Sequence, residues 1–284
     1  MNVSDQKLPE FLNPPLTEVA ISVQFEPLKG LVVPQIGLLW QHYGKKFPHV
    51  EQHSPIDPVI ERLGGRSDSK LPSIQLIQGQ PLPRVWFLDA EKKELLQIQQ
   101  DRFIRNWRKI NNEDRYPRYE DYIRRKFTDD LSDFENFISE NGIGDIKPNQ
   151  CEVTYINHIE TNEVWSDHAD IGKVFTYWEK DFLKNTLYEV EDARFQVRQL
   201  LRNDSGEFLG RLHMSCEPAF AASKEQLPLF ELRLVARMRP HDKTVDGVMC
   251  SIDLCRESIV RSFSTITRKE MHDIWNREKP SSAA

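Results

Sequence analysis

The chain has 284 residues, of which 29% are charged and 39% hydrophobic, and its formal net charge is −6. These proportions are typical of a folded globular protein and exclude an intrinsically disordered chain. The acidic balance argues against a dedicated nucleic-acid binder, because that class depends on clustered basic residues, although it leaves room for a local basic surface.

Three further features bear on the cellular compartment. No run of about 18 apolar residues occurs, so we expect no membrane-spanning helix. The first residues lack the basic and apolar stretches of a signal peptide. The four cysteines are too scattered for a disulfide scaffold, and no C-x-x-C pair typical of zinc sites is present. We therefore expect a cytoplasmic protein with reduced, mostly buried cysteines, no metal ion and no other cofactor.

The first half of the chain predicts a strand, a short helix, further strands and a long helix. Apolar and polar residues alternate over 16–25, as in a strand with one buried face. Apolar residues three and four apart predict a helix over 35–47, with Pro34 in its first turn. The other elements expected are strands over 84–88, 95–99 and 102–108 and a helix over 119–141.

The connection from Pro48 to Pro83 is rich in proline and contains the pair Gly64-Gly65. This composition predicts an irregular segment with one short strand over 74–78. We expect it to be a mobile flap.

The second half repeats the same order. It predicts a strand over 151–159, a helix over 171–183, and a hairpin whose arms are 194–202 and 208–216. A strand over 230–238 and a helix over 248–275 follow, with a break in that helix at Thr265–Thr267.

The matching order predicts an α+β fold built from a duplicated β-α-β-β-β-α unit. We expect twisted antiparallel sheets, with the long helices packed on one face. The units would be residues 1–146 and 147–284, and the two would form one compact structure. Duplicated units of this kind join their sheets at a pseudo-twofold axis and leave a groove there, which suits binding.

The first candidate site is the basic and aromatic stretch 102–126, which has nine arginines and lysines against four acids. Such a stretch can neutralise phosphates while its rings stack on bases, which indicates nucleic-acid or nucleotide binding. The candidate residues are Arg102, Arg105, Trp107 and Arg108. The alternative is that the aromatic residues pack in the core and the charges form a solvated rim.

The second candidate site is a polar set on two predicted strands, Asn157 and His158 on one and Arg211 and His213 on the other. Polar residues on core strands need partners, so they form either a structural network or a ligand pocket. The two histidines could also act as general acid and base in a hydrolase or nuclease. No nucleotide-binding, zinc-protease, serine-hydrolase or calcium-binding motif is present, so the sequence favours a non-enzymatic protein.

Several blocks of the sequence resemble those of a sporadically distributed family of uncharacterised prokaryotic proteins. They are PPLTEV (14–19), DRFIRNW (101–107), NQCEVTYINHI (149–159), GRLHM (210–214) and SFSTITRKEMHDIW (262–275). The resemblance covers nearly the whole chain. It implies a cytoplasmic bacterial or archaeal protein encoded in variable, mobile gene neighbourhoods, and it assigns no reaction and no catalytic residue.

Together these features predict a non-enzymatic binding or protein-interaction component, for example of a bacterial defence or toxin-associated system. We expect a protein partner encoded by a neighbouring gene. The alternatives are nucleic-acid or nucleotide binding through 102–126, and a hydrolase or nuclease that uses His158 and His213.

Overall fold

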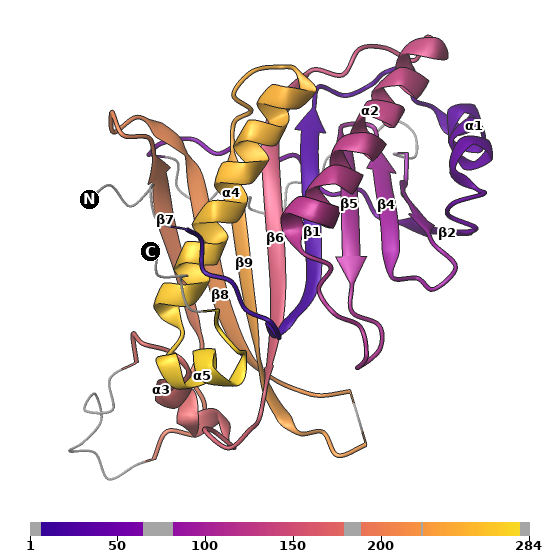
Figure 1. Ribbon diagram of the computed structural model, residues 1–284. Coiled ribbons are helices and arrows are strands. Elements are labelled where there is room, and N and C mark those ends of the chain that lie inside the picture. The colour runs from indigo at the N-terminus through magenta and orange to yellow at the C-terminus, as the bar shows by residue number, and fades with distance from the viewer. Residues whose placement is uncertain (1–6, 65–81, 179–188, 223, 279–284) are drawn as a thin grey trace, which may run out of the picture.

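The computed structural model describes residues 7–64, 82–178, 189–222 and 224–278. Within these ranges it contains one nine-stranded sheet in which all neighbouring strands are antiparallel (Figure 1). In spatial order the strands are β2 (His49–His53), β3 (Arg84–Leu88), β4 (Glu94–Gln99), β5 (Arg102–Arg108), β1 (Leu16–Phe25), β6 (Pro148–Glu160), β9 (Pro228–Met238), β8 (Phe208–Phe220) and β7 (Phe195–Arg202). The fold is therefore α+β with a large antiparallel sheet.

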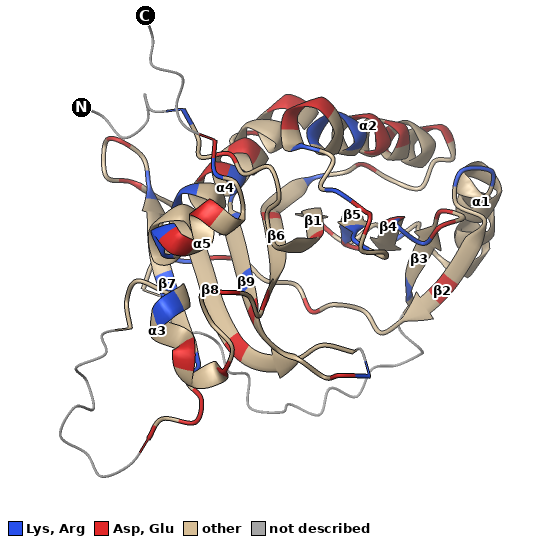
Figure 2. Cartoon of the chain, turned by 60° about the horizontal axis from the view of Figure 1, so that its bottom comes forward, with Lys and Arg blue, Asp and Glu red and all other residues tan. Residues whose placement is uncertain are grey.

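Two long helices lie on the same face of this sheet (Figure 2). They are α2 (Arg125–Glu140), which continues from a π-helical turn η2 (Tyr119–Arg124), and α4 (Val245–Ile266). Helix α4 packs on β6, β8 and β9 and also contacts α2. The shorter helical segments are α1 (Val33–Tyr43), η3 (His168–Asp170), α3 (Ile171–Val174) and α5 (Lys269–Ile274). None of the described helices is both long and apolar enough to cross a membrane.

The hydrophobic core lies between the helices and the sheet. Alternate residues of each strand point to this face, as the pleat of a strand requires. Phe103 of β5, for example, stacks on Phe134 of α2 with 5.0 Å between ring centroids, and Phe25 of β1 lies 6.2 Å from the same ring. Burying these rings against each other supplies the main driving force that fixes α2 on the sheet.

The opposite face of the sheet is polar, and residues 54–62 run across it; we call them the crossing segment. Glutamine side chains of the sheet form hydrogen bonds with the backbone of the crossing segment. Gln99 both accepts from the amide of Ile56 and donates to its carbonyl, each at 2.9 Å. Further along the segment, the side-chain oxygen of Gln24 accepts from the backbone amide of residue 59 and that of Gln150 accepts from the backbone amide of residue 61, each at 2.9 Å. A polar face bound in this way replaces a second apolar layer.

Most strands agree with the sequence predictions. The bounds of β1, β3 and β5 are those expected, and the predicted break at Thr265–Thr267 separates α4 from α5. At the break Thr267 is extended and forms a β-bridge with Phe175. The helices cover one face of an antiparallel sheet, as the fold class implies.

Three predictions about local structure are corrected. The helix expected over 171–183 ends at Val174, because Phe175 adopts an extended conformation for its bridge; residues 179–183 of the predicted range lie outside the described residues. The long helix expected from residue 119 starts instead with a π-helical turn. The connection after Pro48 contains strand β2 and the bound crossing segment, so these residues are not a free flap; the strand predicted over 74–78 lies outside the described residues.

Candidate functional site

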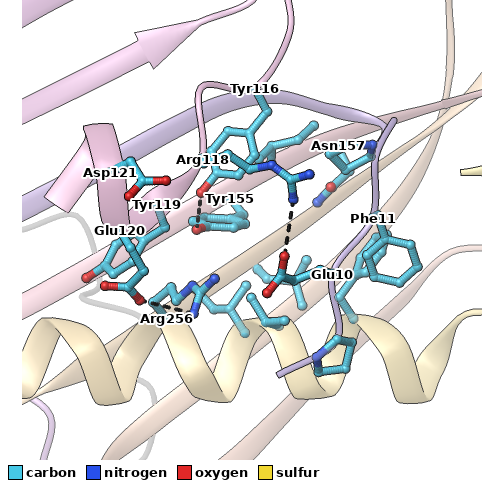
Figure 3. A pocket seen from close by; sticks show the side chains of 17 residues that line it. Glu10, Phe11, Tyr116, Arg118, Tyr119, Glu120, Asp121, Tyr155, Asn157 and Arg256 are labelled. Atoms are coloured by element: carbon cyan, nitrogen blue, oxygen red, sulfur yellow. Dashed lines mark hydrogen bonds and ion pairs between the residues drawn. The ribbon is translucent and has the colours of Figure 1, made fainter. Parts of the chain in front are cut away.

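A cavity of about 330 Å³ lies between the sheet, the turn η2 and helix α4 (Figure 3). Its floor comes from the central strands, one wall from α4, and the other wall from residues 116–121; residues 9–14 form the roof. The lining residues are Pro9, Glu10, Phe11, Pro14, Leu16, Tyr116, Arg118, Tyr119, Glu120, Asp121, Tyr155, Asn157, Leu234, Arg256, Ile259, Val260 and Phe263. Apolar walls with a few converging polar groups are typical of a ligand site.

The wall at 116–121 has an unusual backbone. Arg118 has φ 69° and ψ 147°, a conformation that costs free energy for a residue with a side chain. The turn η2 follows at once, and Ile123 donates to the carbonyl of Arg118 at 3.2 Å. Single π-helical turns and strained residues concentrate at functional sites. Here they bring Tyr116 and Tyr119 to the cavity.

A pair of tyrosines lies at the cavity floor. The hydroxyls of Tyr116 and Tyr155 are 3.1 Å apart, so one donates a hydrogen bond to the other. Burial raises the pKa of both hydroxyls above the usual value, which keeps both protonated at neutral pH. One of the two hydroxyl hydrogens remains after the pair has formed. The cavity floor therefore offers a neutral donor.

Arg256 of α4 places a cation deep in the same cavity. Its guanidinium lies 4.8 Å from the ring centre of Tyr119, and Nη1 is 3.7 Å from the carboxylate of Glu120. Nε is buried and donates to no acceptor within the described ranges. Burial alone would lower the pKa of Arg256, but the neighbouring tyrosines and Glu120 raise it overall, so the group stays charged. A buried donor without an acceptor costs about 1–3 kcal/mol.

The roof of the cavity is fastened to the C-terminal part of the chain. Phe11 packs edge-on against Phe263 and Trp275, at 5.5 and 6.2 Å between ring centroids. The amide of Leu12 donates to the carbonyl of Asn276 at 3.1 Å. At the opening Glu10 and Arg118 face each other, 3.6 Å apart (Figure 3). The roof is thus an ordered part of the fold.

The structure divides the predicted basic and aromatic strand between the two faces of the sheet. Arg105 and Trp107 point to the helices. Arg105 is 4% exposed and pairs with Glu94 and Asp130, so its charge is neutralised inside the protein. Trp107 is buried behind the cavity, 5.9 Å from the ring centroid of Tyr116.

Arg102 and Arg108 lie on the polar face. Arg102 is buried and donates to Gln24 at 2.6 Å and to the carbonyl of Asp57 at 3.2 Å. Arg108 donates to the carbonyl of Lys92 at 2.6 Å. The four candidates therefore form no shared surface on which a nucleic acid could lie.

The second predicted set is divided as well. Asn157 lines the cavity and donates to the carbonyl of Leu232 at 3.2 Å, whereas His158, its neighbour on β6, points to the polar face. In the strand register His158 lies opposite Glu231 of β9, and His213 of β8 lies opposite Val235. The two histidines are therefore not adjacent, and the structure does not bring them together as an acid and base pair.

Arg211 and His213 bind the crossing segment through Glu61. This carboxylate is 5% exposed and pairs with Arg211 and with His213 Nε2, the latter at 2.7 Å, while Arg237 lies 3.9 Å away. Burial alone would raise the pKa of Glu61, but the hydrogen bond from His213 and the surrounding positive charges lower it. These groups form a structural network with their donors already used.

The lining of the cavity defines what chemistry it can support. None of the described lining residues is a serine, cysteine, histidine or lysine, so the usual pairs of nucleophile and base are missing from it. Across the described ranges, no group of three or more His, Cys, Asp or Glu side chains is placed to hold a metal ion. The arrangement is suited to binding.

Most residues of this site are not among the predicted ones, although the sequence contains two signals of it. Arg256 interrupts the buried stripe of α4 formed by Ile252, Ile259 and Phe263. A charged residue at a core position indicates either a buried ion pair or a site. The tyrosines of 116–122 were counted as partners of the basic residues, whereas two of them line the cavity.

Comparison with known protein families finds no model that matches the chain, and comparison with curated proteins finds no match.

Proposed function

We propose that this chain is a non-enzymatic binding protein that takes a small, largely apolar molecule into the cavity between η2 and α4. The observation that carries the proposal is the combination of apolar walls with the guanidinium of Arg256, whose side chain lines the cavity and is 15% exposed. Sites for small molecules are typically apolar clefts with a few fixed polar groups, and a volume of about 330 Å³ falls within their range.

The chemistry of the lining supports binding over catalysis. The tyrosine hydroxyls have raised pKa values, so they are poor nucleophiles and poor bases at neutral pH. Neither alternative function gains a comparable observation. Arg105 and Trp107 are buried, and His158 and His213 lie apart.

We also propose that the two halves are copies of one unit. In each half the first strand pairs with the last one, giving the orders β1-β5-β4-β3 and β6-β9-β8-β7, and a long helix follows. These matching orders support a duplication, with β2 as an addition to the first copy. On this proposal the cavity lies at the junction, since η2 belongs to one copy and α4 to the other.

The wider role that we propose rests on the resemblance of the sequence blocks. The ligand-bound chain would act in the cytoplasm with a protein partner encoded by a neighbouring gene, in a bacterial defence or toxin-associated system. Affinity purification of the tagged chain from cells that carry those genes should recover one neighbouring gene product. A chain that purifies without it would count against this role.

A cavity-filling variant tests ligand binding directly. The tryptophan of Val260→Trp should occupy the cavity, since Val260 lines it and is only partly buried. Asp246→Trp is the matched control, because Asp246 is an exposed residue of the same helix and lines neither this cavity nor the hollow next to it. Ligand-observed NMR with a library of small aromatic fragments should give hits with the wild type and Asp246→Trp that disappear with Val260→Trp. Hits that persist in all three proteins, or no hits at all, would refute the proposal.

A further inference from the structure

We infer that the ligand of this cavity is a small monoanionic acid, a carboxylic acid with a compact aromatic or branched apolar body. The inference rests on the proposed function and names the class of molecule that the cavity takes.

The positive and negative charges of the Arg256–Glu120 pair lie at different depths in the cavity. The side chain of Arg256 is 15% exposed, whereas its carboxylate neighbour Glu120 is 67% exposed and 3.7 Å away. An exposed pair at that distance is weak and is screened by water. The positive charge is therefore inside the cavity, and the negative charge lies at its edge. A ligand carboxylate that reaches the guanidinium would exchange this weak contact for a charge-assisted hydrogen bond.

A neutral hydrogen-bond donor lies beside this cation. The Tyr116 and Tyr155 pair keeps one hydroxyl hydrogen available, and both tyrosines face the cavity with Arg256 (Figure 3). A carboxylate accepts several hydrogen bonds and donates none, which matches a floor of donors. An amine would instead bring a second positive charge against Arg256.

The opening of the cavity is mainly acidic. Glu10, Glu120 and Asp121 lie there, with Arg118 as the opposing charge. This acidic edge repels a polyanion such as a nucleic acid far more strongly than a single carboxylate, because the repulsion grows with the charge of the ligand.

The apolar walls and the volume of the cavity limit the size of the ligand. Leu16, Leu234, Ile259 and Phe263 supply the apolar surface. A dry cavity of about 150 Å³ is sufficient for benzene. The present cavity of about 330 Å³ therefore has room for one ring with a short acidic arm.

Three probes with the same ring test the inference by isothermal titration calorimetry at neutral pH and low salt. They are phenylacetate, phenylacetamide and 2-phenylethylamine, which share the benzyl group and differ in the charge, donors and acceptors of the head group. Phenylacetate should bind at least about tenfold more tightly than the amide, because a hydrogen bond to a charged group is worth about 1.5–3 kcal/mol. The amine should bind most weakly.

Two variants locate the preference. Arg256→Gln should weaken phenylacetate at least about tenfold and change the amide by less than about twofold, so that amide binding also reports an intact fold. Arg125→Gln is the matched control, since Arg125 is exposed at the start of α2, and it should bind all three probes like the wild type.

Each other outcome has a defined meaning. Tighter binding of the amide or the amine, or a preference for phenylacetate that survives in Arg256→Gln, overturns the inference and leaves the proposed function standing. Fragment hits in the library experiment without binding of any of the three probes overturn it equally. No binding in either experiment removes the proposed function together with the inference.

Discussion

His272 of α5 should make the stability of this protein depend on pH. Its Nδ1 accepts a hydrogen bond from Arg277 at 3.1 Å. Its Nε2 therefore carries the hydrogen and donates to Thr267 Oγ1 at 2.8 Å, while that hydroxyl donates to the carbonyl of Phe263 at 2.7 Å. Protonation would place a second N–H at Nδ1, facing a guanidinium. Burial and then the charge of Arg277 lower the pKa of His272 from 6.5 to about 4.

The sign of the effect follows from this lowered value. The unfolded chain takes up the proton near pH 6.5 and the folded chain only near pH 4, so stability is lost as the pH falls between these values. At about 1.36 kcal/mol per pKa unit, the full loss is about 3 kcal/mol, and about 2 kcal/mol is already lost at pH 5. The loss bears on the cavity because Phe11 of the roof packs on the His272 ring, 5.3 Å between centroids.

Urea unfolding at pH 7.5 and pH 5 of the wild type and His272→Gln measures this loss. Glutamine has an amide donor for Thr267 and does not titrate. The wild type should lose about 2 kcal/mol more than the variant between the two pH values. His49→Gln is the control, since His49 is exposed on the edge strand β2, and its loss should match that of the wild type. Equal losses in the wild type and His272→Gln would refute the assignment of this pH dependence to His272.

Three further predictions concern the ion pairs and the roof. Glu61→Gln should lower the free energy of unfolding at pH 7. Because the folded pKa of Glu61 lies below 4.5, the difference in free energy of unfolding between variant and wild type, measured in urea titrations, should shrink as the pH falls through that range. Arg105→Met should cost about 3 kcal/mol in urea unfolding, since it leaves Glu94 without its cation and Asp130 with Lys46 alone, and it should not alter retention of single-stranded DNA in filter binding. Phe11→Ala should cost about 3–5 kcal/mol and speed hydrogen exchange at the amides of Leu12 and Asn13, which donate to the C-terminal part of the chain.

Each of these predictions has an outcome that would contradict it. A constant difference for Glu61→Gln from pH 7 to pH 3 would show that its carboxylate does not titrate with folding. Lost DNA retention in a folded Arg105→Met protein would restore the nucleic-acid alternative. Unchanged exchange at the two amides in Phe11→Ala would show that Phe11 does not fasten the roof.

Local patterns in the sequence predicted those parts of the fold that depend on local residues. Alternation over 16–25 and 102–108 predicted β1 and β5, because a strand with one buried face must alternate. Strand β2 was missed since it is an edge strand with His49 and Glu51 among its five residues, so it shows no apolar alternation. The crossing segment was missed because its contacts are with glutamines on distant strands.

The candidate site could not be predicted in the same way. Its lining comes from the segments 9–16, 116–121, 155–157 and 256–263 together with Leu234, which only the tertiary fold brings together. Alternation along β5 turns Arg105 to the same face as Phe103, but the neutralisation of its charge there depends on Asp130, an acid of α2, and no short-range pattern links the two. A sequence pattern shows where a polar residue occurs. Its partners in the folded chain determine whether it lies on the surface, forms a structural pair or belongs to a ligand site.

The most direct measurement of ligand binding is the resonance of the Arg256 side chain. Titration of phenylacetate into ¹⁵N-labelled protein should shift the Nε–H signal of Arg256, assigned by its loss in Arg256→Gln, and leave the Nε–H signal of Arg211 on the polar face unchanged. A shift at Arg211 with none at Arg256 would show that the cavity between η2 and α4 is not where the ligand binds.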